Sequence, residues 1–299
     1  MFLYGPTAVG KTALAIQLAQ RCNGVIINAD SMQVYDQLRV ITARPSVEEE
    51  AAAPHQHFGV IDPSVRYSTK AWLDDVTRLI AQAQGEGRRP ILVGGTGLYH
   101  SALTGGLSAM PEPSAETLDA IKAMDMDQLR QAIAQEDPAS AHLVDRQRLI
   151  RALSVTRGST PDKPFSYWVA QPNVGAVPGV LTFTLDPDRD KLRERINLRF
   201  ELMVEQGALD EVEGLLARGL DPTLPAMGAI GVPELGGYLS GECDLDHAIE
   251  RASAHSRQYA KRQLTWARNQ MSSAIKLPVT EFKEQETERY LSKIFSFLD

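Results

Sequence analysis

The segment GPTAVGKT, from Gly5 to Thr12, constrains the fold of this 299-residue chain more than any other feature. It matches the pattern Gly-x4-Gly-Lys-Ser/Thr in full and stands between a short apolar run, FLY, and a helical pattern. In such a loop the glycines let backbone N–H groups converge on phosphate oxygens, Lys11 adds positive charge, and the Thr12 hydroxyl can ligate Mg²⁺. We therefore predict a phosphate-binding loop, of the type found in ATP-binding proteins, between a strand and a helix.

Apolar runs of strand length recur along the chain and predict a parallel sheet. After FLY they lie at 25–29, 91–95 and 180–185, and helical patterns lie between them. Strands that alternate with helices form a parallel sheet with crossover helices. From residue 188 onward the pattern is again helical.

Residues 111–171 differ from the rest of the chain. They contain no strand-like run and many helix formers between proline-rich ends, which predicts a helical insertion. The expected fold is therefore α/β, a P-loop parallel sheet flanked by helices, with a catalytic core at 1–110 and 172–299 and a helical insertion domain at 111–171.

Composition excludes several classes of protein. No run of roughly 18 apolar residues is present to span a membrane, and the first residues leave no room for a signal peptide. Cys22 and Cys243 lie far apart and outside any Cys/His cluster, which argues against disulfides and zinc. His55 and His57 have no further ligands nearby in sequence, so a loop-and-strand segment is favoured over a metal site there. We expect a cytoplasmic protein with no membrane contact.

Positive charge is concentrated near the C-terminus of an acidic chain. The net charge is −7, yet residues 251–280 hold no Asp or Glu and carry +6, which leaves −13 on the rest. Such a local surface can attract a polyanion, although a solvated helix face is an equal alternative. The cations are Arg251, Arg257, Lys261, Arg262, Arg268 and Lys276.

The loop does not name its ligand, because any diphosphate satisfies it. A motor or switch NTPase would offer an acidic residue at a strand end to hold Mg²⁺, whereas the run at 91–95 ends in glycines. The nearest acidic residue is Asp30, after the run at 25–29, and the carboxyl ends of parallel strands converge on the ligand crevice. Asp30 is therefore a magnesium ligand or a general base; as the alternative, Asp30 or Ser31 caps a helix.

Several motifs in a fixed order resemble the tRNA dimethylallyltransferases of bacteria. They are GPTAVGKT, NADSMQVY, TARP, VGGTGLY, DRQRLIRAL and AKRQLTW. The resemblance implies transfer of a dimethylallyl group from dimethylallyl diphosphate to the exocyclic N6 amine of the adenine 3′ of a tRNA anticodon. The diphosphate would then be a leaving group, and the bond would break at carbon.

The resemblance also assigns roles to the site residues. Asp30 would be the general base, and Lys11, Mg²⁺ on Thr12 and an arginine would meet the charge of the departing diphosphate. Arg195 and Arg199 follow Lys191 at i+4 and i+8, and the family arginine that matches Arg199 contacts the diphosphate. The implied diphosphate-binding residues are Gly5, Pro6, Thr7, Ala8, Val9, Gly10, Lys11, Thr12, Arg195 and Arg199.

By the same resemblance, the enzyme binds the anticodon stem-loop, from which the target adenine must be turned out of its stack. We expect it to act as a monomer. The residues expected along the tRNA path are Asp30, Ser31, Met32, Gln33, Thr96, Gln147, Arg148, Leu149, Ile150 and Arg151. Taken alone, DRQRLIRAL favours an amphipathic helix with its leucines in a core; the resemblance reverses that preference.

The sequence departs from the family pattern in two places, and two other functions stay open as alternatives. Family glycines are missing from 35–41, and an aromatic residue and a cation are replaced by Val232 and Pro233, which bears on tRNA binding. Prenyl transfer to free AMP is one alternative, although a mononucleotide needs neither the insertion nor the basic segment. The other is a phosphoryl-transferring kinase or NTP-driven protein, which would consume NTP.

Overall fold

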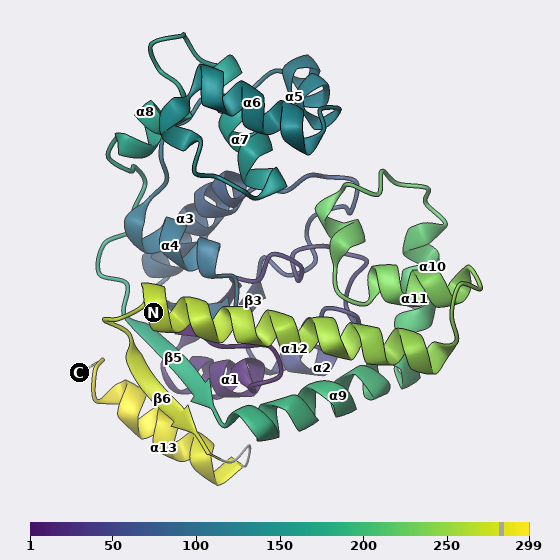
Figure 1. Ribbon diagram of the computed structural model, residues 1–299. Coiled ribbons are helices and arrows are strands. Elements are labelled where there is room, and N and C mark those ends of the chain that lie inside the picture. Colours follow the sequence, from purple (N-terminus) through teal and green to yellow (C-terminus); the bar gives the residue numbers. More distant parts are fainter. Residues whose placement is uncertain (281–283, 299) are drawn as a thin grey trace. The chain divides into compact units, whose positions relative to one another are not determined.

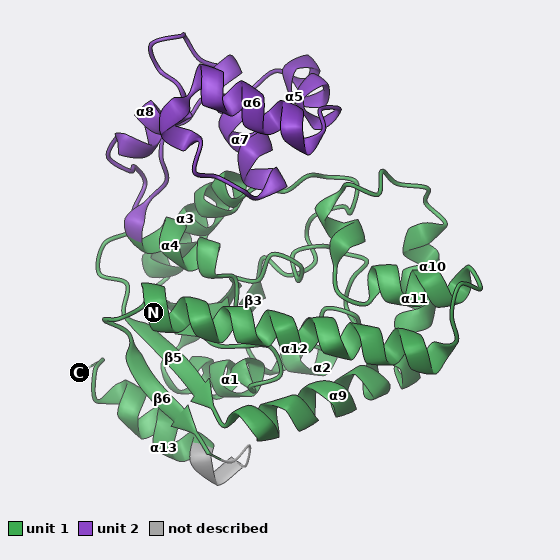
Figure 2. Ribbon diagram, viewed as in Figure 1, with its two compact units in different colours: residues 1–104, 177–299 green, residues 105–176 purple. Residues whose placement is uncertain are grey.

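The computed structural model of the chain describes residues 1–280 and 284–298 and divides into two compact units (Figure 2). The first comprises Met1–Thr104 and Val177–Asp299, and the second comprises Gly105–Ala176. Within the described residues, no helix is long and apolar enough to cross a membrane.

The first unit is built on a parallel sheet (Figure 1). Its strand order is β3-β2-β4-β1-β5-β6, and every neighbouring pair is parallel, which confirms the predicted α/β class. The predicted runs form β1, β2, β4 and β5. The bounds are β1 (Phe2–Tyr4), β2 (Gly24–Asn28), β3 (His55–Gln56), β4 (Arg89–Gly94), β5 (Thr182–Pro187) and β6 (Ile275–Val279).

Strand β6 corrects the sequence prediction, which expected a helical pattern with one Gly/Pro-rich interruption, and no strand, after residue 188. Leu277 and Val279 are buried while Lys276 and Pro278 are exposed, so the segment alternates as a strand does. Pro278 lacks an N–H for a sheet ladder, but within the part of the chain that the structure describes β6 is an edge strand that pairs with β5 alone. Because proline in a short run argues against a strand, the sequence pattern does not predict β6.

Helices cover the sheet, and two of them, α9 and α12, run side by side (Figure 1). Asp244 begins α12 by accepting a hydrogen bond from the backbone N–H of His247, and buried Ala248, Ala252 and Ala260 allow close packing. The helices of this unit are α1 (Lys11–Arg21), α2 (Val47–Ala52), α3 (Thr69–Gly85), α4 (Gly97–Gly105), α9 (Arg189–Glu205), α10 (Ala208–Leu216), α11 (Val232–Leu239), α12 (Leu245–Gln270) and α13 (Glu284–Phe295), with a 3₁₀ turn at Pro225–Gly228.

The second unit is helical and has its own core, which includes Ile121, Leu129, Ile133, Leu149 and Leu153. Its helices are α5 (Ala115–Lys122), α6 (Met126–Glu136), α7 (Arg146–Arg157) and α8 (Phe165–Ala170), with a 3₁₀ turn at Pro138–Ser140. They lie in the segment where the sequence predicts a helical insertion, and the unit extends beyond the predicted bounds of 111–171 at both ends.

A buried carboxylate organises one corner of this second unit. Asp137 is 1% exposed and accepts hydrogen bonds from the Ser140 hydroxyl at 2.7 Å and from the Ser166 backbone N–H at 2.9 Å and hydroxyl at 2.6 Å. These bonds satisfy a charge that would be costly to bury alone, and they tie the start of α8 to the end of α6.

Candidate functional site

The phosphate loop connects β1 to α1 as the motif predicts. Ala8 and Gly10 adopt left-handed backbone angles, with φ of 64° and 92°, so the chain turns sharply before α1 begins at Lys11. Among the described residues, no side chain caps this helix N-terminus, which leaves its N–H groups and the positive end of its dipole to a ligand. The Lys11 ammonium folds back and donates to the carbonyls of Gly5, at 3.0 Å, and Pro6, at 2.8 Å.

Two arginines from α9 reach the same loop. Arg199 Nη2 donates to the Thr7 hydroxyl at 2.6 Å, and Arg195 Nε donates to the Ala8 carbonyl at 3.0 Å. Burial lowers the pKa of Lys11 to about 8 and that of Arg199 to about 10, and in both cases the Asp30 carboxylate opposes the shift. Several positive groups therefore lie close together beside the phosphate loop, where water solvates them poorly. A bound polyanion would stabilise their charged forms.

Asp30 lies at the carboxyl end of β2 and is held by its neighbours. Its backbone N–H donates to Asn28 Oδ1 at 2.8 Å, and its own Oδ1 accepts from the Met32 N–H at 2.9 Å. The chain after Asp30 forms turns rather than a helix, so neither Asp30 nor Ser31 caps a helix and that alternative is wrong. Its Oδ2 accepts no hydrogen bond from a described residue and remains available to a ligand.

The glycines at the end of β4 let that strand approach the other parts of the site. A Cβ on Gly94 would lie 2.0 Å from the Ala29 carbonyl oxygen, and one on Gly95 would lie 2.0 Å from Gln263 Nε2. Just beyond them, Thr96 Oγ1 accepts from the Ser31 N–H at 3.0 Å. The glycine-ended strand therefore permits close approach to the Asp30 turn and to α12, where a larger residue would force them apart.

Gln263 on α12 was missed by the sequence analysis. Its side-chain carbonyl accepts from the Thr7 N–H at 2.8 Å, and its side-chain amide donates to the Gly95 carbonyl at 2.9 Å. It is 3% exposed, so both bonds are made away from water. Gln263 stands in the motif AKRQLTW, among cations and an aromatic residue, and that motif is the signal in the sequence that points to it.

Two cavities of the first unit meet at Asp30. The larger, of about 520 Å³, is lined by the whole of Thr7–Thr12 and by both arginines of α9; we call it the donor cavity. The smaller, of about 250 Å³, is lined by Ser31, Met32, Tyr259 and Arg262; we call it the acceptor cavity. The residues common to both are Thr7, Asp30, Thr42, Arg199 and Met203.

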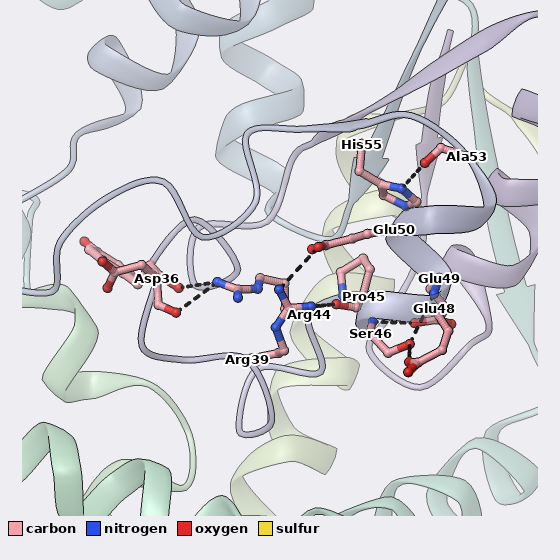
Figure 3. Close-up of polar contacts among 11 residues, drawn as sticks. Asp36, Arg39, Arg44, Pro45, Ser46, Glu48, Glu49, Glu50, Ala53 and His55 are labelled. Carbon is pink, nitrogen blue, oxygen red and sulfur yellow. Dashed lines mark hydrogen bonds and ion pairs between the residues drawn. The ribbon is translucent and has the colours of Figure 1, made fainter.

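The segment 39–46 forms one wall of the donor cavity, and Figure 3 shows how its side chains are held. Arg39 Nη2 lies 3.3 Å from Glu50 Oε2, and Arg44 Nη1 donates to the carbonyls of Tyr35 and Asp36, each at 3.1 Å. Ser46 caps α2 through the Glu49 N–H at 3.2 Å. These bonds give this wall a defined shape although it contains no strand.

Glu211 on α10 anchors the same segment from the other side. Its Oε2 accepts from the backbone N–H groups of Arg39, at 2.8 Å, and Val40, at 2.7 Å, while Oε1 accepts from Ile41 at 2.9 Å. Three convergent N–H groups form a small anion site, and here a carboxylate of the chain itself fills it. The sequence offers no signal for this contact.

The histidines behave as a loop-and-strand pair. His55 Nδ1 lies 2.8 Å from the Ala53 carbonyl oxygen, and His57 Nε2 lies 2.9 Å from the Tyr67 hydroxyl. Among the residues that the structure describes, no group of three or more His, Cys, Asp or Glu side chains could hold a metal ion. His55 also lines the donor cavity, a position that its sequence context does not indicate.

The residues expected along the tRNA path fall into two groups. In the first unit, Ser31 and Met32 line the acceptor cavity, Gln33 lines the donor cavity, and Thr96 bonds to Ser31. In the second unit they lie on α7, where the side chains of Gln147, Arg148 and Arg151 are exposed, Ile150 is partly buried, and Leu149 is 1% exposed in the core. Leu149 thus has no side-chain surface for RNA and can only hold its helix in place.

The first departure from the family pattern, at 35–41, lies against Gly231, the residue just before the second departure. A Cβ on Gly231 would lie 2.3 Å from Ile41 Cδ1, so the Ile41 side chain fills the space over this glycine, whose φ is +104°. Pro233 stands in the first turn of α11, where a missing N–H costs no hydrogen bond, and Glu234 Oε2 accepts from the Gly231 N–H at 2.7 Å. Ile41 also lines the acceptor cavity, so the first departure contributes to the wall of that cavity.

Two family models match this chain. The family model described as IPP transferase matches residues 33–270, and that described as isopentenyl transferase matches residues 1–54. The chain is 46% identical over 278 residues to the tRNA dimethylallyltransferase of Rhodopseudomonas palustris (strain BisB18), which covers 91% of this chain and 88% of that protein.

Solved structures are similar over almost the whole chain. The full-length tRNA isopentenylpyrophosphate transferase of Bacillus halodurans has a TM-score of 0.73 and 33% identity, covering 99% of this chain and 94% of that one. A eukaryotic dimethylallyltransferase described as acting on tRNA has a TM-score of 0.82 and 27% identity, covering 99% of this chain and 78% of that one.

The parallel sheet and the loop geometry define an α/β protein in which a glycine-rich loop joins a strand to a helix at a ligand crevice. Given the extent of the match to the family model and the similarity to its relatives, the chain belongs to the IPP transferase family. The resemblance inferred from the motifs is confirmed.

Proposed function

We propose that this chain transfers a dimethylallyl group from dimethylallyl diphosphate to the exocyclic N6 amine of the adenine 3′ of a tRNA anticodon and releases diphosphate. Family membership supports this class of reaction. The observation that carries the proposal is that Asp30 lines both cavities, together with Thr7 and Arg199. A donor held by the phosphate loop and a base in the acceptor cavity would meet at this carboxylate.

The donor cavity is suited to stabilise a leaving diphosphate. Backbone N–H groups of the loop, the Lys11 ammonium and the Arg199 guanidinium converge on one place, and burial strengthens their interaction with an anion. As the allylic C–O bond breaks, negative charge grows on the diphosphate and positive charge on carbon. Groups that hold the diphosphate more strongly as its charge increases lower the barrier.

The residues present also fit Mg²⁺, which usually keeps several waters and is held by few protein ligands together with substrate phosphates. The Thr12 hydroxyl lines the donor cavity with Asp30 and makes no hydrogen bond with any described residue. We propose that Thr12 holds the ion beside the diphosphate. When bound, the ion would supply further positive charge to the leaving group.

Asp30 is suited to accept the proton of the amine. An aryl amine is hardly acidic before reaction, so its proton is lost late, as the new C–N bond makes the nitrogen cationic. Oδ1 of Asp30 is engaged by the Met32 N–H, which fixes the carboxylate, while Oδ2 has no partner among the described residues. We assign proton acceptance to Oδ2.

The acceptor cavity is suited to a base turned out of its stack. Tyr259 offers a ring to stack on, and the Arg262 guanidinium lies 5.7 Å from the centroid of that ring. Burial and the Asp30 carboxylate raise the pKa of Tyr259, so its hydroxyl stays protonated and can donate to a base.

One assay tests the proposal. Protein and Mg²⁺ are mixed with labelled dimethylallyl diphosphate, and tRNA, AMP or no acceptor is offered. We expect label in tRNA and one diphosphate released for each prenyl group transferred. Label in AMP but not in tRNA would instead assign a mononucleotide acceptor, and ATP hydrolysis without prenyl transfer would exclude a prenyltransferase.

A further inference from the structure

Glu234, in the first turn of α11, is a buried carboxylate that the proposed reaction does not use. The residue is 4% exposed and is not among the described residues that line the donor or the acceptor cavity. Its Oε2 accepts a hydrogen bond from the Gly231 N–H at 2.7 Å, and its Oε1 accepts one from His255 Nδ1–H on α12. A carboxylate is costly to bury unless its oxygens are bonded, and here both are. The Glu234 side chain therefore ties the chain before α11 to α12.

Each partner of Glu234 adjoins a wall of the acceptor cavity. Gly231 directly follows the turn 228–230, and His255 directly precedes Ser256. The turn and Ser256 both line the acceptor cavity, and α11 packs against α12 (Figure 1). Glu234 thus joins two walls of this cavity that come from separate parts of the chain.

The turn 228–230 is otherwise bonded only to its own surroundings. The Ala229 N–H donates to the Ala226 carbonyl at 3.1 Å, and the Ala229 carbonyl accepts from the Val232 N–H at 2.9 Å. Among the described residues, the hydrogen bonds of Glu234 are the ones that connect this part of the chain to α12. The position of the turn relative to α12 therefore depends on this carboxylate as well as on packing.

His255 extends this constraint along α12. Ser256 follows it by one position and Tyr259 by four, so a shift of the helix at His255 would move both cavity-lining residues relative to the turn. The Ser256 residue is 6% exposed, and its hydroxyl makes no hydrogen bond with a described residue, so this group is available to a bound base. Placement of such groups matters, because an error of about 1 Å can cost roughly 10²-fold in rate.

We propose that Glu234 is a positioning residue for the acceptor base and that it acts through His255. The pair holds the turn 228–230 at a fixed spacing from Tyr259, so that a base between them presents its amine to Asp30. The proposal rests on the proposed function, since it assumes an adenine acceptor in this cavity. Neither member of the pair touches the base.

A carboxylate that only begins α11 would behave differently. Its bond to Gly231 alone would serve that purpose, as the Glu side chain of a capping box does, and the contact with His255 would be dispensable. The His255 side chain is 47% exposed, so a change there disturbs the core little. Variants at His255 therefore separate positioning of the base from stability of α11.

The test compares His255→Leu with His255→Asn. Asn Nδ2 can occupy the place of His Nδ1 and donate to Glu234, whereas Leu cannot donate. His247→Leu, at an exposed position of the same helix, is the matched control. Single-turnover transfer is measured with saturating enzyme and donor in excess over tRNA, and the Kd values for tRNA and for a donor analogue are measured directly. Thermal unfolding shows whether each variant is folded.

For His255→Leu we expect the single-turnover rate to fall about 10–100-fold, because the base is placed less precisely. The Kd for tRNA should change less than about threefold, since phosphate contacts dominate that affinity, and the Kd for the donor analogue should not change. His255→Asn should recover the rate to within about threefold of wild type, and His247→Leu should match wild type. Lower stability alone would reduce the fraction of active enzyme and leave the rate constant of the folded enzyme unchanged.

A double-mutant cycle tests whether Glu234 acts through His255. Glu234→Leu should be at least as slow as His255→Leu, and the double variant should be no slower than Glu234→Leu alone. His255→Ala, which removes the donor without adding an apolar side chain, should give the same result as His255→Leu.

The positioning proposal is overturned if His255→Leu and His255→Ala keep the wild-type rate, if His255→Asn is as slow as His255→Leu, or if the two losses add in the double variant. Its failure differs from failure of the proposed function. In that second case the wild-type protein transfers no prenyl group to tRNA, whatever the variants do.

Discussion

Gln263 accepts a hydrogen bond from the backbone N–H of Thr7 at 2.8 Å, although 256 positions separate the two residues. The same side chain donates to the Gly95 carbonyl at the end of β4. One amide thus couples the phosphate loop, the central strand and α12. Because its two ends differ, as acceptor and donor, an isosteric carboxylate or hydrocarbon cannot replace it at both bonds.

Gln263→Leu should lower both stability and donor affinity. It leaves the Thr7 N–H and the Gly95 carbonyl unpaired in a buried place, which costs about 1–3 kcal/mol for each group. Thermal unfolding and isothermal titration with a dimethylallyl diphosphate analogue measure the two effects. Gln258→Leu, on an exposed position of the same helix, is the matched control and should leave both unchanged. Equal behaviour of the two variants would contradict the coupling role.

Asp30→Asn should lower turnover by about 10²–10⁴-fold, because the amine proton loses its acceptor. An Asn Oδ1 still accepts from the Met32 N–H, so the turn and the donor cavity should persist. Rapid-quench transfer with saturating tRNA and donor gives the chemical step, and direct titration gives donor affinity. Asp36→Asn, an exposed site outside both cavities, serves as control. Unchanged turnover in Asp30→Asn would remove Asp30 from the base role.

Donor binding to the free enzyme should weaken as pH rises through about 8. The pKa of Lys11 is lowered from 10.5 to about 8 by burial, so the ammonium is charged below that pH and is lost above it. The effect of pH on folding stability has the opposite sign. Between about pH 8 and pH 10.5 the unfolded chain binds more protons at Lys11 than the folded chain does, so the contribution of Lys11 to the free energy of unfolding increases as pH rises.

Titration of the donor analogue between pH 6.5 and 9.5 measures the effect on binding. Lys11→Ala should bind weakly throughout and lose the step near pH 8. A step of the same size in Lys11→Ala would assign the titration to another group.

Glu211→Gln should loosen the segment 39–46. An amide oxygen can accept from the N–H groups of Val40 and Arg39, but its NH₂ would face the Ile41 N–H as a second donor. We expect the free energy of unfolding to fall by about 1–3 kcal/mol. Hydrogen exchange at 39–41 should become faster, and the KM for the donor should rise. Glu213→Gln, exposed on the same helix, should change none of these. Wild-type exchange rates at 39–41 in Glu211→Gln would show that the anchor is dispensable.

Much of the fold could be predicted because local signals were strong. The strands at β1, β2 and β4 are contiguous apolar runs, and the phosphate loop is a complete motif between two elements. Strand β6 was missed because it has few buried positions and because a proline lies among them. A proline inside a strand is tolerated at a sheet edge, which is where β6 lies. Edge position is a property of the assembled sheet and is invisible in the run itself.

Sequence patterns alone indicate the phosphate loop, the acidic residue after the second strand, the helical character of 115–170 and the family. These depend on residue types at short spacing, where backbone geometry links neighbours directly. Only the folded chain shows that Gln263 bonds to Thr7, that Glu211 anchors Ile41 from 170 positions away, and which hollow each cation of α12 lines. Such partners depend on how α9 packs against α10 and α12 in the folded chain, and spacing along the chain does not encode them.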